Sequence, residues 1–278
     1  MIEDALVSVA WLSEQLHNEH VVVLDATLAK PKSSAGDMTH WDKQIPGAQF
    51  FDIDHSFSNP NSTLPHMLCD AAQFQKEARK LGINNDSLIV IYDQHGVYSS
   101  PRAWWMFRAM GHDQVAVLDG GLPLWMEKNL PTEQKKNQSV KDGNFTANYH
   151  QKYFVDAAYV NANIENDDSL TIDARSRGRF SGTDPEPREG LRGGHIPNSA
   201  CLPFTDVVDG YQMKPVSQLK EMFSSLDADG KRLIFSCGSG LTACIILLAA
   251  HLAGYNDLTV YDGSWSEWGQ PGDLPVAK

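Results

Sequence analysis

The chain has 278 residues, of which 42% are hydrophobic and 21% are charged. At about 150 residues per domain, this length predicts two domains or one large one, and the composition excludes collagen-like, disordered and disulfide-scaffold proteins. Asp and Glu number 35 against 23 Lys and Arg, and no basic run occurs, so the formal charge of −12 argues against nucleic acid or an anionic membrane as a partner.

The sequence has the features of neither a membrane anchor nor a signal peptide. Its longest apolar stretch, residues 243–250, is much shorter than the roughly 20 residues that a membrane-spanning helix needs. The N-terminus is acidic, whereas a signal peptide begins with basic residues. We therefore expect a soluble protein of the cytoplasm, where cysteines stay reduced.

The predicted elements follow the same order in both halves of the chain. The first half runs through the segments 21–26, 45–53, 71–81 (helix), 88–96, 103–110 (helix) and 117–125. The second half runs through 170–175, 195–204, 216–226 (helix), 233–240, 243–253 (helix) and 260–268. Matching residues are offset by 148 positions for Asp25 and Asp173, by 144 for Asp93 and Cys237, and by 143 for Trp125 and Trp268. This nearly constant offset indicates an internal duplication.

Short apolar strands alternate with helices in each half. This pattern predicts the α/β class, with two tandem domains that each have a mainly parallel central sheet flanked by helices. The polar stretch 132–152 shows no helix or strand periodicity and is predicted to be a linker, so the domains would be residues 1–131 and 153–278. Ligands of such sheets bind beyond the carboxyl ends of the strands, and this directs attention to Asp93 and Cys237.

Cys237 is the cysteine whose position points to chemistry. It stands between the apolar strand that ends at Ser236 and the apolar helix 243–253. The N–H groups and the dipole at a helix N-terminus favour an anion, and Gly238 and Gly240 let the loop curl with its N–H groups inward. We therefore predict a thiolate nucleophile at Cys237.

The other cysteines are Cys69, Cys201 and Cys244. No two of the four are spaced as C-x-x-C, so we expect neither a zinc site nor a disulfide framework. Cys201 and Cys244 are predicted to be core residues. Cys69 lies in a loop near His66, where an exposed thiol would be open to oxidation.

Three other interpretations of the Cys237 loop stay open. The run from Gly238 to Ala243 fits a dinucleotide-binding pattern, but only 40 residues follow Gly238, too few for the further βαβ units of that fold. A cysteine phosphatase would place an arginine at the position of Ala243 to bind phosphate. Finally, Cys237 would be only a turn residue, as Asp93 is at the matching position of the first half.

The loop Cys237-Gly-Ser-Gly-Leu-Thr242, its strand-to-helix setting and the duplicated halves resemble the two-domain rhodanese-fold sulfurtransferases, specifically the 3-mercaptopyruvate sulfurtransferases. The resemblance extends over nearly the whole chain and includes the segments 50–54, 64–68, 99–112, 178–190, 192–197 and 261–269. Thiosulfate-preferring relatives carry a loop of the type Cys-Arg-Lys-Gly, whose cations suit a dianion. Here the corresponding residues, Gly238 and Ser239, are neutral.

The resemblance also implies which residues bind the substrate. Arg179 and Arg188 would hold the carboxylate and carbonyl of 3-mercaptopyruvate, a task that planar guanidinium groups suit. The alternative is that these arginines only order their own loop by pairing with carboxylates at Asp184, Glu186 or Glu189.

A proton relay is implied in the same way. In the family a serine, a histidine and an aspartate assist the chemistry, and the matching residues are Ser239, His66 and Asp54. Asp52 is the alternative to Asp54, since either carboxylate suits such a loop. In this arrangement the non-catalytic half supplies part of the site.

The reaction that the resemblance implies is covalent. Cys237 takes sulfur from 3-mercaptopyruvate, pyruvate leaves, and the persulfide is cradled by the backbone N–H groups of Gly238, Ser239, Gly240, Leu241 and Thr242. A thiol acceptor, such as thioredoxin or a small thiol, then removes the sulfur. Cyanide can take the place of the thiol. No metal or organic cofactor is expected. Two other functions stay open, a thiosulfate sulfurtransferase and a non-enzymatic rhodanese-like binding module.

Overall fold

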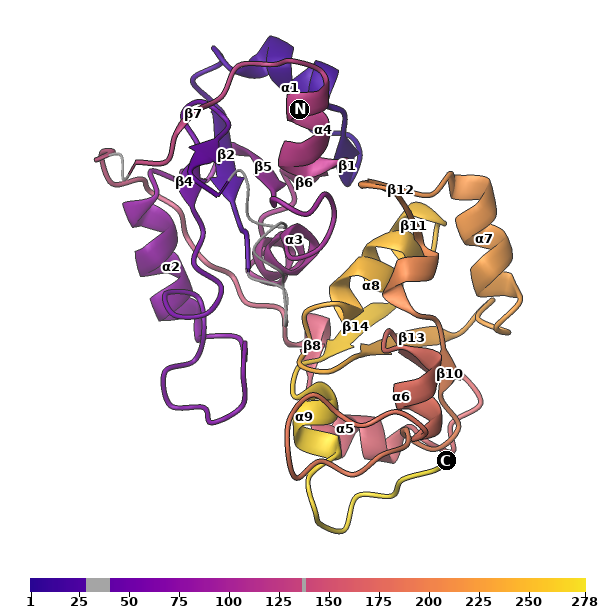
Figure 1. The fold of residues 1–278 in the computed structure, drawn as a ribbon. Coiled ribbons are helices and arrows are strands. Elements are labelled where there is room, and N and C mark those ends of the chain that lie inside the picture. The colour runs from indigo at the N-terminus through magenta and orange to yellow at the C-terminus, as the bar shows by residue number, and fades with distance from the viewer. Residues whose placement is uncertain (29–40, 137–138) are drawn as a thin grey trace. The chain divides into compact units, whose positions relative to one another are not determined.

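The computed structural model describes residues 1–28, 41–136 and 139–278, which form two compact units (Figure 1). Unit 1 comprises residues 1–60, 69–150 and 210–213, and unit 2 comprises residues 61–68, 151–209 and 214–278. The chain changes unit between His150 and Gln151, inside the predicted linker 132–152, of which residues 137 and 138 lie outside the described part. Each unit also includes a short segment from the other half of the sequence.

Unit 1 is built on a parallel sheet of five strands in the order β1-β6-β5-β2-β4. These strands are β1 (Leu6–Val7), β2 (Val21–Asp25), β4 (Gln49–Phe50), β5 (Leu88–Tyr92) and β6 (Val115–Leu118). Its helices are α1 (Val9–Gln15), α2 (Ala71–Lys80), α3 (Ser100–Ala109) and α4 (Gly121–Glu127). A two-residue antiparallel pair, β3 (Lys43–Gln44) with β7 (Glu133–Gln134), lies outside this sheet, and β12 (Gln212–Met213) is in the returning segment.

Unit 2 has the same plan, with a parallel sheet in the order β10-β9-β13-β14-β8. These strands are β8 (Phe154–Val155), β9 (Ser169–Asp173), β10 (Ala200–Cys201), β13 (Arg232–Ser236) and β14 (Leu258–Tyr261). The helices are α5 (Ala157–Ala162), α6 (Arg177–Ser181), α7 (Val216–Ser224), α8 (Ala243–Leu252) and α9 (Ser264–Trp268). The remaining elements are β11 (Val208–Asp209) and two short 3-10 turns, Gln151–Tyr153 and Phe204–Asp206.

The two sheets match strand by strand, and this confirms the predicted α/β fold of two similar parts. In each unit the two central strands end in register, with Asp25 beside Tyr92 and Asp173 beside Ser236. The next residues, Asp93 and Cys237, therefore leave their sheets at the carboxyl edge, where ligands of parallel sheets bind.

Alternating apolar side chains divide each sheet into two packed faces. In unit 1, Val90 and Tyr92 of β5 pack with α1 and α4, and Trp125 of α4 is fully buried there. Ile89 and Ile91 point to the opposite face, on the side where α3 packs. Unit 2 repeats this with Ile234 and Tyr261 under α5 and α9, and with α8 packed against β13 and β14.

The predicted helices agree with the structure within three residues at each end. The largest difference is α3, which begins at Ser100 and not at Ala103, because Pro101 occupies the first turn, where a missing N–H breaks no helical bond. The predicted linker contains β7, and its later part runs along unit 1, where Gly143 N–H donates to the carbonyl of Arg79 at 2.8 Å.

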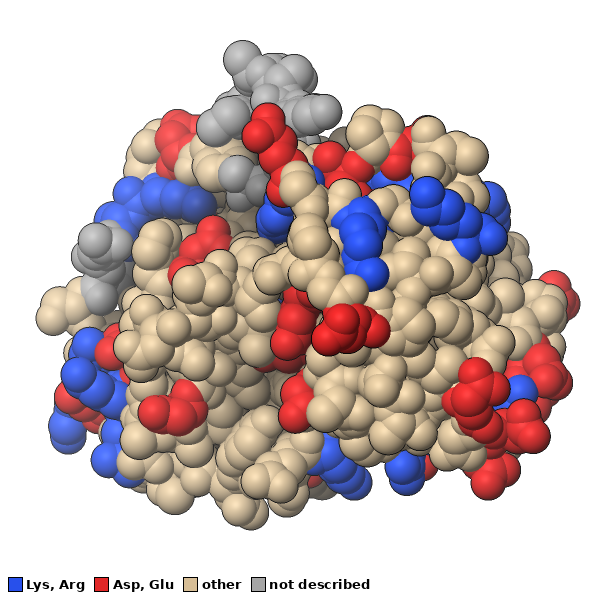
Figure 2. All heavy atoms as spheres, turned by 90° about the horizontal axis from the view of Figure 1, so that it is seen from below, with Lys and Arg blue, Asp and Glu red and all other residues tan. Residues whose placement is uncertain are grey.

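On the face drawn in Figure 2, Lys and Arg side chains are interspersed with Asp and Glu side chains, so that face carries mixed charge. Among the residues that the structure describes, no helix combines the length and apolar character that crossing a bilayer requires.

Candidate active site

The loop 237–242 joins β13 to α8 in unit 2. The strand is buried from Leu233 to Ser236, and α8 is buried over its first eight residues, so both ends of the loop are fixed by the core. Only 1% of the surface of Cys237 is exposed. Gly240 has a φ of +73°, which residues with a side chain rarely adopt, and this lets the loop turn toward α8.

The start of α9 supports this loop from behind. The Trp265 N–H donates to the carbonyl of Cys237 at 2.9 Å, and the Ser266 N–H donates to the carbonyl of Gly238 at 2.8 Å. The Ser266 hydroxyl donates to the same Gly238 carbonyl at 2.8 Å. The orientation of the loop therefore depends on the segment 261–269, one of the segments on which the family resemblance rests.

The two predicted substrate-binding arginines lie beside Gly238. A Cβ atom placed on Gly238 would be 3.2 Å from Nη2 of Arg179 and 3.8 Å from Nη1 of Arg188. Arg179 belongs to α6 and Arg188 to the loop that follows it. The structure thus brings both guanidinium groups to the residue next to Cys237, where a larger side chain would compete with them for space.

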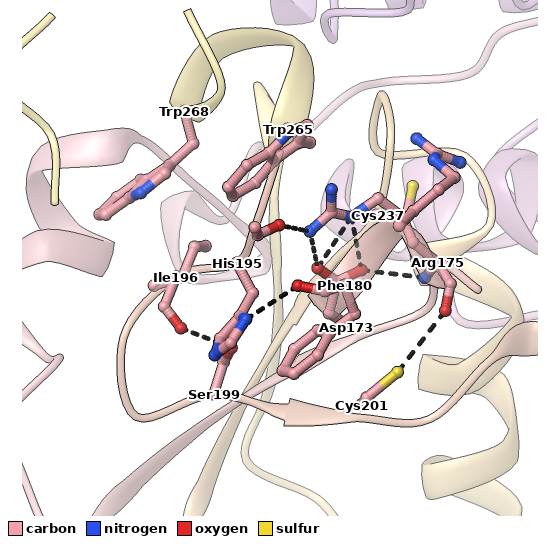
Figure 3. Close-up of polar contacts among 12 residues, drawn as sticks. Asp173, Arg175, Phe180, His195, Ile196, Ser199, Cys201, Cys237, Trp265 and Trp268 are labelled. Atoms are coloured by element: carbon pink, nitrogen blue, oxygen red, sulfur yellow. Dashed lines mark hydrogen bonds and ion pairs between the residues drawn. The ribbon is translucent and has the colours of Figure 1, made fainter. Parts of the chain in front are cut away.

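A cluster of ionised side chains is buried behind Arg179. Arg175 has no exposed side-chain surface, and its Nη2 lies 2.6 Å from Asp173 Oδ2 (Figure 3). Its Nη1 lies 2.8 Å from Glu186 Oε1, and its guanidinium faces the Trp265 ring at 4.0 Å. The second oxygen of Glu186 accepts from Arg179 at 2.6 Å. The carboxylate pairing considered for Arg179 therefore occurs, and it occurs in a position where Arg179 also reaches Gly238.

The charges of this cluster are balanced. Burial lowers the pKa of the Arg175 guanidinium, but the carboxylates of Asp173 and Glu186 outweigh burial and raise it above its usual value. Two carboxylates and two guanidinium groups cancel formally, so the exposed Arg188 adds a positive charge beside Gly238. This local charge is the reversal of sign that an acidic protein needs to bind an anion.

His66 lies in the segment 61–68, which belongs to unit 2 together with Cys237 and Ser239. Its φ of +61° is uncommon for a residue with a side chain. The end of the segment is fixed by Asp262, which directly follows β14 and whose Oδ2 accepts the N–H of Leu68 at 2.8 Å. The segment that carries His66 is therefore tied to unit 2 through a residue of the 261–269 motif.

Asp54, the third member of the predicted relay, is exposed and belongs to unit 1. Its part in the relay stays a prediction. Asp52, the alternative, accepts the backbone N–H of His55 at 3.1 Å and contacts the His55 ring at 3.1 Å. Asp52 therefore caps its own turn.

The environment of Cys69 differs from the prediction. Only 3% of its surface is exposed, and it directly precedes Asp70, the N-cap of α2. Burial, helped by the nearby Asp70 carboxylate, raises the pKa of the Cys69 thiol to about 12. Cys69 is therefore not the exposed, oxidisable thiol that its position in a loop would have allowed.

Cys201 is half-buried, although it was predicted to be core. Its thiol donates to the carbonyl of Arg175 at 3.7 Å (Figure 3). Burial and the Asp173 carboxylate raise the pKa of this thiol to about 11. Cys244 is fully buried in α8, as predicted. Both Cys69 and Cys201 are thus kept in the neutral thiol form at physiological pH.

Three residues that shape this site were not identified from the sequence: Arg175, Asp262 and Ser264. The useful signal was in the duplication. Asp262 matches Asp119 at the same offset, so both halves keep an aspartate after the corresponding strand. At the positions that match Arg175 and Ser264, the first half has different residues, Thr27 and Gly121. Such differences indicate where the two halves differ in function.

Several known proteins resemble this chain in sequence and in fold. A family model described as "Rhodanese-like domain" matches residues 8–128 and 156–271. 3-Mercaptopyruvate sulfurtransferase of Homo sapiens is 40% identical over 274 residues, which cover 95% of this chain and 91% of that protein. Thiosulfate sulfurtransferase of Gallus gallus is 36% identical over 272 residues, which cover 95% and 93%. A solved 3-mercaptopyruvate sulfotransferase structure from Escherichia coli has a TM-score of 0.83 and 34% identity and covers 95% of this chain and 100% of that chain.

Proposed function

The chain belongs to the family of proteins built from rhodanese-like domains, and we propose that it is a sulfurtransferase that moves sulfur from 3-mercaptopyruvate through a persulfide on Cys237. The observation that carries this proposal is the meeting of two guanidinium groups beside Gly238 in a loop with neutral side chains. A cation beside the nucleophile, and not within its loop, suits a substrate whose carboxylate lies some bonds away from the sulfur that is attacked.

The first half-reaction loads the enzyme. The Cys237 thiolate attacks the sulfur of 3-mercaptopyruvate while Arg179 and Arg188 hold its carboxylate and carbonyl. A sulfur–sulfur bond forms, the carbon–sulfur bond breaks, and its electron pair leaves with pyruvate as the enolate. The enolate then takes up one proton, which we assign to the relay of Ser239 and His66, with Asp54 orienting the histidine.

The persulfide is held by the backbone of the loop. In unit 1 the carboxylate of Asp93 shows which N–H groups such a loop can offer, because it accepts from His95, Tyr98, Ser99 and Ser100. Of the predicted cradle, Ser239 and Thr242 match these donors, as does Ala243 beyond it, whereas the Gly240 N–H donates to Ser264 Oγ at 3.0 Å. The fourth, Cys244, donates to the carbonyl of Leu241 at 3.1 Å. These donors stabilise the charge on the outer sulfur.

The second half-reaction unloads the enzyme. A thiolate acceptor attacks the outer sulfur, becomes a persulfide itself and returns Cys237 to the thiolate. We propose thioredoxin or a small thiol as this acceptor, with cyanide as a substitute in the test tube. A reducing location, the cytoplasm expected from the sequence, would keep both thiols available.

Thiosulfate is the second candidate donor, because a relative of 36% identity is named for it. It is a dianion, and the Arg179 charge is already balanced by Glu186 at 2.6 Å, which favours a monoanionic donor. Rates of thiocyanate formation from cyanide with each donor decide this point. A clear preference for thiosulfate would overturn the choice of 3-mercaptopyruvate.

The sulfur-carrying role is tested by mass spectrometry. Incubation with 3-mercaptopyruvate should add one sulfur atom to Cys237, and Cys237→Ser should abolish both the adduct and turnover. Cys201→Ser is the matched control, because the Cys201 thiol is held neutral and should carry none of the adduct. Folded wild-type protein without the adduct would favour the non-enzymatic binding module.

A further inference from the structure

Ser264 is fully buried behind the Cys237 loop, at the first position of α9. Its φ is +48°, in the left-handed region where a residue with a side chain is uncommon. Such a conformation is retained where the surroundings demand it and is often found at functional sites. The hydrogen bonds of the Ser264 hydroxyl indicate what this conformation contributes to the Cys237 loop.

The Ser264 hydroxyl joins both ends of the turn at 237–240. Its Oγ accepts the N–H of Cys237 at 3.2 Å and the N–H of Gly240 at 3.0 Å. It donates its own proton to the carbonyl of Tyr261, the last residue of β14, at 2.9 Å. One donor and two acceptor sites are all that a hydroxyl has, so its full capacity is used.

The matching position in unit 1 is Gly121, at an offset of 143 residues. Gly121 has a similar φ of +54°, but a Cβ atom there would collide with the carbonyl oxygens of Asp93 and Gly96. Unit 1 therefore has no room for a hydroxyl behind its loop. Its loop is held from inside, because the Asp93 carboxylate occupies the space that the loop encloses.

The two units thus organise the same loop from opposite sides. In unit 2 an internal anchor would block the sulfur that Cys237 has to receive. We propose that Ser264 is a positioning residue that replaces this anchor from outside, fixing the Cys237 and Gly240 amides so that the interior of the loop stays open for the transferred sulfur. This inference rests on the proposed sulfurtransferase function and adds a residue to it.

Removal of the hydroxyl should affect the reaction step more than substrate binding. The amides of Cys237 and Gly240 would lose their acceptor, and the loop would no longer be held in one arrangement. Arg179 and Arg188 belong to a different segment and should still bind the carboxylate. We therefore expect kcat to fall about 10- to 100-fold, the scale associated with displacement of a reacting group by about 1 Å, with little change in KM.

The test uses two variants of the full chain. Ser264→Gly keeps access to the positive φ, as Gly121 shows for the matching position, and Ser264→Ala keeps the Cβ atom. Ser199→Ala is the control, because the Ser199 hydroxyl donates to a backbone carbonyl of the same unit, at 2.6 Å to Ile196, without touching the loop. Steady-state kcat and KM, the single-turnover rate of pyruvate release and thermal unfolding are measured for each.

The expected result is a slow loading step and an almost unchanged KM in both Ser264 variants, with kcat in Ser199→Ala close to that of the wild type. A folded Ser264→Gly or Ser264→Ala protein that loads sulfur at the wild-type rate would overturn the inference. So would a loss of rate that follows only the loss of thermal stability across the three variants. Inactive wild-type protein would instead overturn the proposed function itself, which keeps the two failures distinct.

Discussion

The loops that follow β5 and β13 begin from the same scaffold and hold different groups. In unit 1 the Leu122 N–H donates to the Asp93 carbonyl at 3.0 Å, and in unit 2 the Trp265 N–H donates to the Cys237 carbonyl at 2.9 Å. The Asp93 carboxylate is a fixed anion that fills its loop. Cys237 places at the same point a sulfur atom that can receive and release another one.

This difference separates what the fold supplies from what the residue supplies. A parallel strand followed by a helix presents N–H groups to any anion at the strand end. Asp93 turns that property into stability, because its carboxylate is satisfied by its own loop. At Cys237 the same property becomes available to a reaction intermediate, provided that the loop is held by other means.

The largest effect should come from giving unit 2 the residue of unit 1. Cys237→Asp should abolish sulfur transfer, by at least about a thousandfold, because no nucleophilic sulfur remains. If the loop is an anion site, the free energy of unfolding of this variant should nevertheless lie within about 1 kcal/mol of the wild-type value, because the carboxylate finds N–H donors. Pyruvate release and chemical denaturation measure the two quantities.

The matched control for this substitution is Cys237→Asn, which has nearly the same shape without the charge. We expect it to be equally inactive and less stable than Cys237→Asp at neutral pH. Equal stability of the two variants, or strong destabilisation of Cys237→Asp, would contradict the idea that the loop favours an anion.

A second substitution transfers Thr27 of unit 1 to the matching position in unit 2. Arg175→Thr should destabilise unit 2 by about 3–5 kcal/mol, because Asp173 and Glu186 lose the cation that is buried between them. In unit 1 the corresponding Asp25 forms an ion pair with Lys135, with Nζ 2.8 Å from Oδ2. Denaturant unfolding measures the loss.

The control for Arg175→Thr is Arg232→Thr, which removes an exposed pair with Asp257 at 3.0 Å. Since exposed pairs contribute little, we expect a loss below about 1 kcal/mol. Similar losses in the two variants would mean that the buried cluster does not carry the stability assigned to it.

The third effect concerns the anion of unit 1. Asp93→Asn should destabilise unit 1 by about 2–3 kcal/mol, because an amide NH2 would face N–H groups that now donate to a carboxylate. Oδ2 alone accepts from the N–H groups of Tyr98, Ser99 and Ser100 at 2.8–2.9 Å. Thermal unfolding checks this, with the exposed Asp113→Asn as control. An Asp93→Asn protein as stable as the control would show that the carboxylate is not the anchor of its loop.

The sequence was sufficient for the features that repeat. Apolar runs ending at Asp93 and Cys237 marked two strand ends, and the constant offset between halves indicated two copies of one sheet. The Cys237 loop could be identified because an apolar strand, two glycines and an apolar helix are signals that lie next to one another in the sequence. Helix ends were less certain, as the start of α3 at Ser100 shows.

What escaped prediction depends on contacts between distant segments. Arg175 would be expected on the surface by residue type, and its complete burial requires Glu186, eleven positions away, together with Asp173 and Trp265. No periodicity indicates that residues 61–68 join unit 2 or that 210–213 join unit 1. The burial of Cys69 likewise does not follow from its position in a loop before α2.

The smallest predicted effect concerns Asp119, the aspartate that follows β6 and holds the segment 210–213 in unit 1. Asp119 accepts the N–H of Met213 at 2.9 Å and the amide of Gln212 at 2.9 Å. Burial raises the pKa of the Asp119 carboxyl above its ordinary 3.8, although these two hydrogen bonds act to lower it.

Because the folded pKa is above the unfolded one, the stability contributed by this group is present at low pH and is lost as pH rises through the folded pKa. Relative to Asp119→Asn, the wild type should therefore be more stable at about pH 4 than at about pH 7.5, by no more than about 1 kcal/mol because the carboxyl is partly screened by solvent. Thermal unfolding of both proteins at the two pH values measures this, with the exposed Asp142→Asn as control, and a difference of opposite sign would mean that the hydrogen bonds from the returning segment outweigh burial.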